Sequence, residues 1–365
     1  MTNKIIRAIL STCLLDKTQS TKSKRKEFIV LQTNDYCILS YLSSNQLDQP
    51  IDQVGRIIQI FNQSNITIAD RHGTIHHSLL LTGLLKQQIS QASDSLTVGD
   101  FVSLENKAGQ LVISDVLPRV NQLSKNISSA RKSIHVKSGL QLLAANISDV
   151  FIVVACDQRF TIALLERYLL AFSLNHVQLH ILLTKRDFRQ GFTQISQLIE
   201  QAYPKLSCLS LSIYDQTVLL FLTRFYQPKV LRSLSALLEL VNRRLIINQL
   251  AGRQLQKTGA VRLGDQRGKH TTTSSHLYFI SPEFGYLIDT PGIKEIGLVN
   301  NDQSGLFSDI DALAAQCKFR NCRHENEPGR AVQAAIASGQ LDAERFQRYR
   351  KYQRELQRHL KRDGR

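Results

Sequence analysis

The chain has 365 residues, enough for two or three domains that each bury a core of their own. It carries 46 Lys and Arg against 30 Asp and Glu, which gives a formal net charge of +16 and a pI near 9.7. This balance favours a polyanionic partner over an acidic protein and leaves RNA, DNA and anionic membrane open. The apolar run at residues 5–15 contains Arg7 and lacks a small-residue cleavage site. We therefore expect no signal peptide, no membrane anchor and a cytoplasmic protein.

Residues 1–50 are polar and lack a clear period, with a basic cluster at Lys22, Lys24, Arg25 and Lys26. We interpret this stretch as a mobile basic arm. A solvated leader without a role is the alternative.

Residues 51–120 contain short β-type runs between turn signals, at 55–58, 78–82, 98–102 and 111–113. Several short strands in so short a stretch are typical of a small barrel of the OB type. Barrels of this type often bind nucleic acid, which agrees with the positive charge.

Residues 121–300 change to an α/β pattern. Val150–Ala155 reads as a buried parallel strand, residues 164–175 have helical spacing, and residues 179–183 form a second apolar strand. Strand, helix and strand at this spacing indicate a βαβ unit. Further strands are expected at 276–280 and at 284–287, and the latter leads into Asp289.

Two short motifs follow these strands. Thr184-Lys185-Arg186-Asp187 suits guanine reading, because the aspartate can accept the N1 and N2 protons of guanine while the lysine stem packs over the base. Asp289-Thr290-Pro291-Gly292 suits a loop whose aspartate holds Mg²⁺ through water and whose glycine amide meets a γ-phosphate. An ordinary Pro-Gly turn after a strand is the alternative for the second motif.

The two motifs stand in the reverse of the order found in most GTP-binding domains. This order predicts a circularly permuted G domain, with the phosphate loop G-x-x-x-x-G-K-[ST] between them. Between them also lies a polar loop in which His270 could orient water, and Thr271 or Thr272 could complete a magnesium shell. A threonine-rich surface loop is the alternative.

Residues 301–365 look helical from Ile310 onwards, and residues 344–365 are densely basic. Of the cysteines at 13, 37, 156, 208, 317 and 322, only the last two are closely spaced near a histidine. Cys317, Cys322 and His324 form a set of donors that zinc accepts, whereas a disulfide framework is not indicated. A structural site needs a fourth ligand, and the nearest candidate position holds Arg330.

Together these segments resemble the ribosome small subunit-dependent GTPase A family, called RsgA or YjeQ. The resemblance runs from about residue 50 to the C-terminus in the order of the family, and it is carried by Val116 to Arg119, Leu143 to Asn146, Leu165 to Leu169, Thr184 to Asp187, Gly268 to Thr272, Leu287 to Gly292 and Cys317 to Gly329. It implies an N-terminal OB-fold barrel, a central α/β circularly permuted P-loop-type G domain and a C-terminal α-helical zinc-binding-type domain.

The resemblance also implies roles. Such proteins bind the small (30S) ribosomal subunit and its 16S rRNA late in assembly and hydrolyse GTP to GDP with Mg²⁺. Thr184, Lys185 and Asp187 would contact guanine, while Asp289, Gly292 and Thr271 or Thr272 would serve magnesium and the γ-phosphate. His270 would be the catalytic residue. Zn²⁺ would be held by Cys317, Cys322 and His324, with Arg330 at the position of the family's fourth cysteine.

The phosphate loop is the main departure from the family. Its position is occupied by Ala236, Leu237, Leu238, Glu239, Leu240, Val241, Asn242, Arg243 and Arg244, and no glycine occurs between Gly191 and Gly252. A phosphate cradle needs glycine for left-handed turns and for close approach of backbone N–H groups. The printed chain therefore lacks the loop.

A shifted reading frame could explain this departure. If Ser235 to Arg244 are encoded TCG GCC CTT CTG GAG TTG GTA AAT CGT CGT, reading from the last base of the serine codon gives G-P-S-G-V-G-K-S-S. This string is the usual loop of the family. We hypothesise a one-base loss near Val218 and a compensating gain near Leu245; divergence into a pseudo-GTPase is the rival.

Two functions follow from the sequence. The first is an RsgA-like GTPase of ribosome biogenesis, and the second is a non-catalytic factor that binds rRNA or the ribosome through its barrel and basic C-terminal helix. We expect a monomer and no membrane role.

Overall fold

The structure is a computed structural model. It describes residues 35–62, 65–92, 95–126, 140–172, 177–211, 231–236, 247–248, 250–255, 275–281, 285–290, 305–319, 322 and 331–362. The basic cluster at residues 22–26 lies outside these ranges. The described residues belong to one compact unit, residues 34–365.

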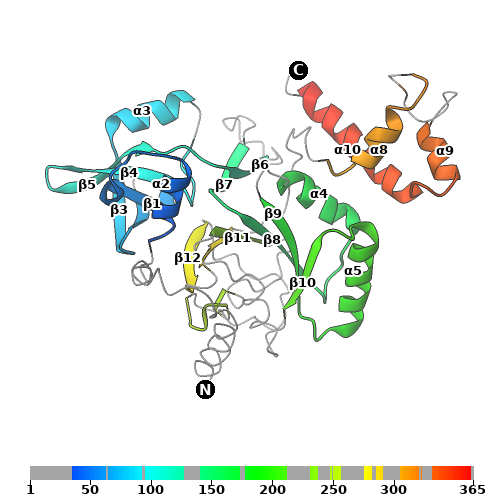
Figure 1. Cartoon of the computed structure of the whole chain (residues 1–365), viewed down its shortest axis with the longest axis horizontal. Helices are drawn as coiled ribbons and strands as arrows, with labels where there is room; N and C mark the ends of the chain where they lie inside the picture. The colour runs from blue at the N-terminus through cyan, green and yellow to red at the C-terminus, as the bar shows by residue number, and fades with distance from the viewer. Residues whose placement is uncertain are drawn as a thin grey trace, which may run out of the picture. The chain divides into compact units, whose positions relative to one another are not determined.

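A closed five-stranded barrel forms the N-terminal part (Figure 1). Its strands are β1 (Val54–Asn62), β2 (Asn65–Asp70), β3 (Ile75–Leu81), β4 (Phe101–Lys107) and β5 (Gln110–Val116). They pair in the order β1-β2-β3-β5-β4, and β4 pairs again with β1 and so closes the barrel. Helix α3 (Gly83–Ala92) joins β3 to β4. The predicted barrel is confirmed, with its apolar positions alternating toward one interior cluster around Ile57, Ile68 and Val102.

Two details of the barrel differ from the sequence prediction. The run at residues 98–102 is not one strand, because a turn at Gly99 (φ +96°) precedes β4. A side chain at Gly99 would place its Cβ 2.2 Å from the carbonyl oxygen of Ala145, so glycine is required there. Helix α3 was not predicted; it buries only Leu85 and has little apolar period to detect.

The second part is an α/β sheet. Its strands lie in the order β10-β9-β8-β11-β13-β12, and all are parallel except β12. They are β8 (Asp149–Ala155), β9 (Gln178–Thr184), β10 (Ser207–Leu211), β11 (Leu231–Ala236), β12 (His276–Ser281) and β13 (Gly285–Asp289). Helix α4 (Ile162–Phe172) links β8 to β9, and α5 (Arg189–Ala202) links β9 to β10. Each helix therefore joins two neighbouring parallel strands, as in a βαβ unit.

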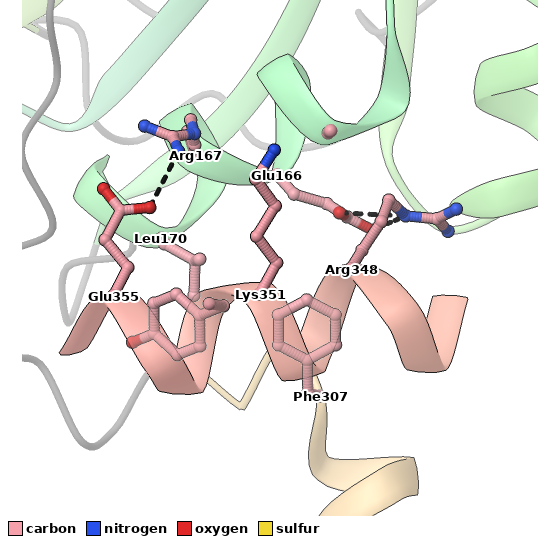
Figure 2. A pocket seen from close by; sticks show the side chains of 9 residues that line it. Glu166, Arg167, Leu170, Phe307, Arg348, Lys351 and Glu355 are labelled. Carbon is pink, nitrogen blue, oxygen red and sulfur yellow. Dashed lines mark hydrogen bonds and ion pairs between the residues drawn. The ribbon is translucent and has the colours of Figure 1, made fainter. Parts of the chain in front are cut away.

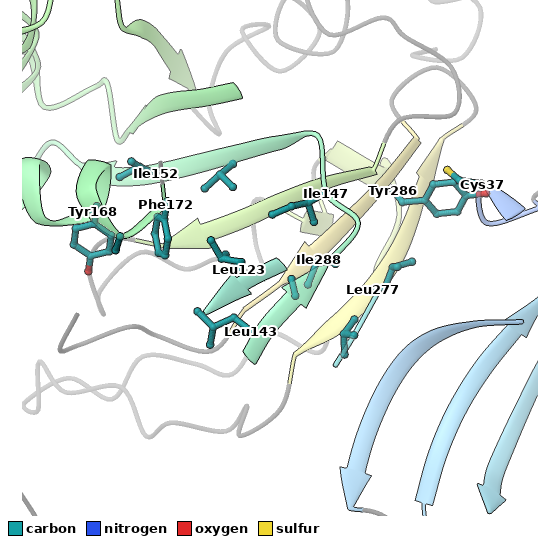
Figure 3. Close-up of a cluster of buried hydrophobic side chains, with 14 of the residues drawn as sticks. Cys37, Leu123, Leu143, Ile147, Ile152, Tyr168, Phe172, Leu277, Tyr286 and Ile288 are labelled. Carbon is teal, nitrogen blue, oxygen red and sulfur yellow. The ribbon is translucent and has the colours of Figure 1, made fainter. Parts of the chain in front are cut away.

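The sheet order explains the apolar strands. Every residue of β8 and of β13 is buried, as expected for strands in the middle of a parallel sheet covered on both faces. A separate hairpin, β6 (Gln122–Asn126) and β7 (Leu140–Ala145), packs beside this sheet. Figure 3 shows the resulting core, in which side chains of the hairpin, β8, α4, β12 and β13 meet, including Leu123, Leu143, Ile152, Phe172, Leu277 and Ile288.

A buried arginine joins the barrel to the rest of the chain. Arg56 of β1 is 1% exposed, and its guanidinium donates hydrogen bonds to the carbonyls of Tyr36 (2.9 Å) and Asn146 (3.1 Å). The same group lies 4.4 Å from the ring centroid of Phe101. Burial lowers the pKa of this guanidinium. One side chain of the barrel thus holds backbone from two other segments.

The segment before the barrel also differs from prediction. We expected an irregular arm up to residue 50, but Ile38–Ser44 forms helix α2. Tyr41 of this helix stacks on Phe101 at 3.8 Å between ring centroids and donates a hydrogen bond to the carbonyl of Pro118 (2.6 Å). The backbone N–H of Tyr36 donates to the hydroxyl of Tyr286 on β13 (2.8 Å). The prediction missed this helix because its buried residues, Ile38, Tyr41 and Leu42, are few and stand among polar residues.

The described residues of the C-terminal part contain the helices α8 (Ser308–Ala314), α9 (Ala331–Ala337) and α10 (Ala343–Arg362). Phe307, Ile310, Val332 and Phe346 build a small apolar core, and Leu170 of α4 is part of it. The predicted helical C-terminus is confirmed. Among the helices in the described ranges, none is both long and apolar enough to cross a membrane.

We predict that Arg56→Ala lowers the free energy of unfolding by about 3 kcal/mol, because one buried and one partly buried carbonyl lose their donor and a cavity is left. Denaturant unfolding measures this change. Arg71→Ala is the control: Arg71 pairs with Asp52, whose side chain is 67% exposed, and its loss should cost less than about 0.5 kcal/mol. Equal effects of the two substitutions would contradict a structural role for Arg56.

Candidate functional site

The carboxyl ends of four parallel strands meet at one edge of the sheet. Ala155 of β8 lies beside Thr184 of β9, and Leu234 of β11 lies beside Asp289 of β13. Because the strands are parallel, the loops that follow them leave the sheet at this same edge. Both predicted nucleotide motifs therefore begin there, although they are about a hundred residues apart in sequence.

The guanine motif begins at the end of β9. Thr184 is buried, and its hydroxyl donates to the carbonyl of Val154 (3.3 Å). Lys185 adopts a left-handed backbone conformation (φ +55°), uncommon for a residue with a side chain. Asp187 is exposed at the edge of the sheet, where its carboxylate can accept hydrogen bonds from a ligand. Thr184 thus anchors the loop, and the two residues after it are turned outward.

An ion pair holds the lysine of this motif. The Lys185 ammonium contacts the carboxylate of Asp157, which lies just beyond β8. Both side chains are more than a third exposed, so the pair contributes at most about 1 kcal/mol. Its effect is to direct the lysine stem along the loops of β8 and β9. Sequence reasoning missed Asp157, since no motif marks it and only the pairing of β8 with β9 brings it close.

The second motif begins at the end of β13. Asp289 and Thr290 are both buried, at 1% and 0% exposure. His276 of β12 pairs in register with Asp289 on the neighbouring antiparallel strand. Burial lowers the pKa of the His276 imidazole to about 4, so this histidine is neutral at physiological pH. The structure therefore places the predicted magnesium-side aspartate at a buried position of the sheet, with an uncharged histidine as its cross-strand neighbour.

Several predicted site residues lie outside the described residues. They are His270, Thr271, Thr272, Gly292, the loop residues 237–244, His324 and Arg330. Ala236, the first residue of the degenerate loop position, ends β11. The roles assigned to all these residues, and to Thr184, Lys185, Asp187 and Asp289, stay predictions.

The two closely spaced cysteines lie near the C-terminal helices. Cys317 and Cys322 are half-buried, and the Cys317 thiol donates weakly to the carbonyl of Leu313 (4.0 Å). Within the part of the chain that the structure describes, no three histidine, cysteine, aspartate or glutamate side chains gather as a metal site would require. Two thiols alone do not complete a tetrahedral zinc site.

A buried carboxylate fastens the C-terminal helices to the α/β sheet. Glu166 of α4 is 3% exposed and accepts two hydrogen bonds from Arg348 of α10, both at 3.0 Å (Figure 2). It also accepts one from the hydroxyl of Tyr203, at the end of α5 (2.7 Å). That hydroxyl in turn accepts from Arg345 (3.1 Å). Burial, with the nearby Glu166 carboxylate, raises the pKa of Tyr203.

This network of hydrogen bonds fixes the orientation of α10 against α4 and the end of α5. Helix α4 follows β8 and Asp157, and α5 follows β9 and the guanine motif. Beside it, Arg167 of α4 donates to Glu355 of α10 (2.7 Å), and Leu170, Phe307 and Tyr352 line a small cavity between the helices. One face of α10 is therefore held against the sheet domain, and the other face is left for solvent or a partner.

Comparison with known proteins gives a consistent result. A sequence model described as RsgA GTPase matches residues 116–299. A protein from Vibrio parahaemolyticus named small ribosomal subunit biogenesis GTPase RsgA 2 is 33% identical over 338 residues, covering 89% of each chain. A protein from Listeria monocytogenes named small ribosomal subunit biogenesis GTPase RsgA 1 is 34% identical over 274 residues, covering 73% of this chain and 74% of that one.

Two solved structures share the fold. YjeQ from Thermotoga maritima superposes with a TM-score of 0.57 at 21% identity, over 83% of this chain and 98% of that chain. YloQ, described as a circularly permuted GTPase, superposes with a TM-score of 0.54 at 20% identity, over 84% and 95%. This similarity in fold agrees with the circularly permuted G domain predicted from the order of the two motifs.

We predict that stability falls as pH falls from 6.5 to about 4. The pKa of His276 is 6.5 in the unfolded chain and about 4 in the folded one, so in this window the unfolded chain binds the proton more readily. The loss attributable to His276 should reach about 3 kcal/mol. Urea unfolding at a series of pH values measures it. His276→Gln should flatten this slope, whereas the exposed His72→Gln should leave it unchanged.

We predict that the printed chain binds GTP too weakly to measure at micromolar concentrations. The missing loop removes the lysine, the magnesium-side hydroxyl and the amide cradle together. Titration with a fluorescent GDP analogue tests this. Asp187→Asn is the control and should change nothing, because no specific site remains to be weakened. Micromolar binding that Asp187→Asn abolishes would contradict the prediction.

Proposed function

Since this chain belongs to the RsgA GTPase family, we propose that it binds the small ribosomal subunit during assembly and that, where the phosphate loop is read in the displaced frame, it hydrolyses GTP there. The observation that carries the proposal is that β9 and β13, which end in Thr184 and Asp289, have their carboxyl ends at the same edge of one sheet. The relatives named small ribosomal subunit biogenesis GTPases support it, because the Vibrio protein matches along 89% of the chain.

The nucleotide would lie across this edge. Thr184, Lys185 and Asp187 would hold the guanine base, with Asp187 accepting its N–H groups and the Lys185 stem, directed by Asp157, lying over the ring. Asp289 would hold the water shell of Mg²⁺, which shields the phosphate charge. His270, Thr271, Thr272 and Gly292 would complete the site from loops that lead into β12 and out of β13.

We propose the outer face of α10 as the contact to 16S rRNA. Arg350, Arg354 and Arg358 recur at every fourth residue, and Lys351, which also lines the cavity against α4, adds a further charge at the edge of this face. Lys351, Arg354 and Arg358 are exposed. A row of cations along one helix face matches the spacing of backbone phosphates, and neutralising phosphates releases counterions. The barrel would supply a second contact, as such barrels often do.

Further properties follow from this proposal. A factor that acts on maturing subunits would work in the cytoplasm, and one copy per subunit requires only a monomer. Zinc would be held by Cys317, Cys322 and His324, with Arg330 leaving the fourth position to a water molecule. The C-terminal core around Phe307 and Phe346 would then fold without depending on the metal.

A second candidate function is a non-catalytic factor that binds the small subunit without nucleotide. It is favoured by the absence of glycine between Gly191 and Gly252 in the printed chain. Co-sedimentation with purified small subunits, with and without a non-hydrolysable GTP analogue, separates the two functions. Binding strengthened by the analogue supports the GTPase, whereas binding that ignores it supports the second candidate.

We predict that Arg354→Glu/Arg358→Glu weakens binding to small subunits at least about tenfold at physiological salt, because two phosphate contacts become repulsive. The slope of log affinity against log salt should fall by about 2. Co-sedimentation over a salt series gives both values. Lys205→Glu/Arg253→Glu changes two exposed cations elsewhere by the same charge and should have little effect. Equal weakening by both pairs would show only a dependence on net charge.

A further inference from the structure

An acidic residue interrupts the cationic outer face of α10. Glu355 lies on the groove that Arg354 and Arg358 also line, and its side chain is 26% exposed. A carboxylate at this position would repel phosphate groups that approach the neighbouring cations. A face of α10 that binds RNA therefore needs a positive charge that offsets Glu355.

The offsetting charge comes from α4. The Arg167 guanidinium donates a hydrogen bond to the Glu355 carboxylate at 2.7 Å, as the dashed line in Figure 2 shows. The Arg167 side chain is itself 38% exposed, so solvent or a ligand can reach it. A guanidinium carries five N–H groups, and the pair with Glu355 is made through Nη2. Arg167 can therefore neutralise Glu355 and still donate to a phosphate.

Lys351 and Glu355 connect the two helices into one surface. Both residues line the outer groove of α10, and both also line the small cavity between α10 and α4. The cationic face of α10 thus continues across this edge to Arg167 of α4. On the inner side, Arg348 binds the buried Glu166 through two hydrogen bonds of 3.0 Å, which hold the helices together. The surface is therefore formed before a ligand arrives, which lowers the cost of binding.

The aromatic side chains of α10 are engaged by the C-terminal core. Phe346 is 1% exposed. Tyr349 and Tyr352 pack on Phe307, with ring centroids 5.4 and 6.0 Å apart, and the Tyr349 hydroxyl donates to Asp311 of α8 (2.9 Å). Proteins that bind single strands stack the unpaired bases on aromatic side chains. A surface of cations on two fixed helices suits a duplex better, because its bases are already stacked and its phosphates are regularly spaced.

We propose that α4 and α10 together form a surface for the phosphate backbone of double-stranded RNA, in which Arg167 offsets Glu355 and contacts phosphate directly. Recognition of this kind depends on the shape of the duplex and not on its sequence. The choice of RNA over other polyanions rests on the proposed function. Binding to a bare RNA duplex needs neither the ribosome nor a nucleotide, so it can be measured apart from that function.

Fluorescence anisotropy with the full chain and a duplex of about 16 RNA base pairs measures this binding. The comparison is an unstructured single strand of about 32 nucleotides, which carries a similar number of phosphates. We expect the duplex to bind at least about tenfold more tightly. Equal affinity for the two RNAs, or tighter binding to the single strand, overturns the duplex surface.

Two substitutions in one ion pair test the role of Arg167. Arg167→Gln should weaken duplex binding about fivefold and lower the slope of log affinity against log salt by about 1, because one phosphate contact is lost. Glu355→Gln should strengthen binding about twofold, because a repulsive charge is removed. Arg253→Gln removes an exposed cation elsewhere and is the control, with little effect expected on either value.

Both substitutions break the same ion pair, so a purely structural role for this pair would change binding in the same direction. Effects of the same sign, or an effect of Arg167→Gln no larger than that of the control, overturn the proposed contact. If the chain binds the duplex but not small subunits, the ribosomal function fails while the duplex surface stands. If it binds small subunits but not the duplex, the surface fails while the ribosomal function stands.

Discussion

Parallel pairing of β11 with β8 and β13 is the constraint on which the nucleotide edge depends. Without this strand, the sheet would be two separate halves, one carrying Thr184 and the other Asp289. With it, the loops after four strands leave at one edge, because parallel strands share the direction of their carboxyl ends. The pairing is between segments far apart in sequence, so it is established only when the whole domain folds.

Two buried polar groups attach the other parts to this sheet. Arg56 holds the barrel through carbonyls of Tyr36 and Asn146, and Glu166 holds the C-terminal helices through Arg348. A buried charge costs desolvation, and a single misplaced contact leaves it unsatisfied. Buried charged groups therefore favour the one arrangement of barrel, sheet and helices in which their hydrogen bonds are made. A purely apolar contact would also tolerate slightly shifted arrangements.

These contacts connect the surface proposed for RNA to the surface proposed for nucleotide. Helix α10 is gripped by α4 and α5, which follow the strands leading to the guanine motif. A second contact reaches β13 itself. The hydroxyl of Tyr286, three residues before Asp289 on this strand, accepts a hydrogen bond from the backbone N–H of Tyr36, in the segment before the barrel. Continuous packing is the physical route by which occupancy of one surface could bias the other.

The sequence by itself determined the family, the barrel, the permuted order of the motifs and the position where a phosphate loop belongs, because these depend on short local patterns. It did not reveal α2, Arg56 or Asp157 as structural contacts, since each gains its role from a partner distant in the chain. Tertiary structure alone decided that β11 lies between β8 and β13 at the centre of the α/β sheet. The position of a strand in a sheet depends on the strands that pair with it, and the tertiary fold, not the strand's own sequence, decides which strands these are.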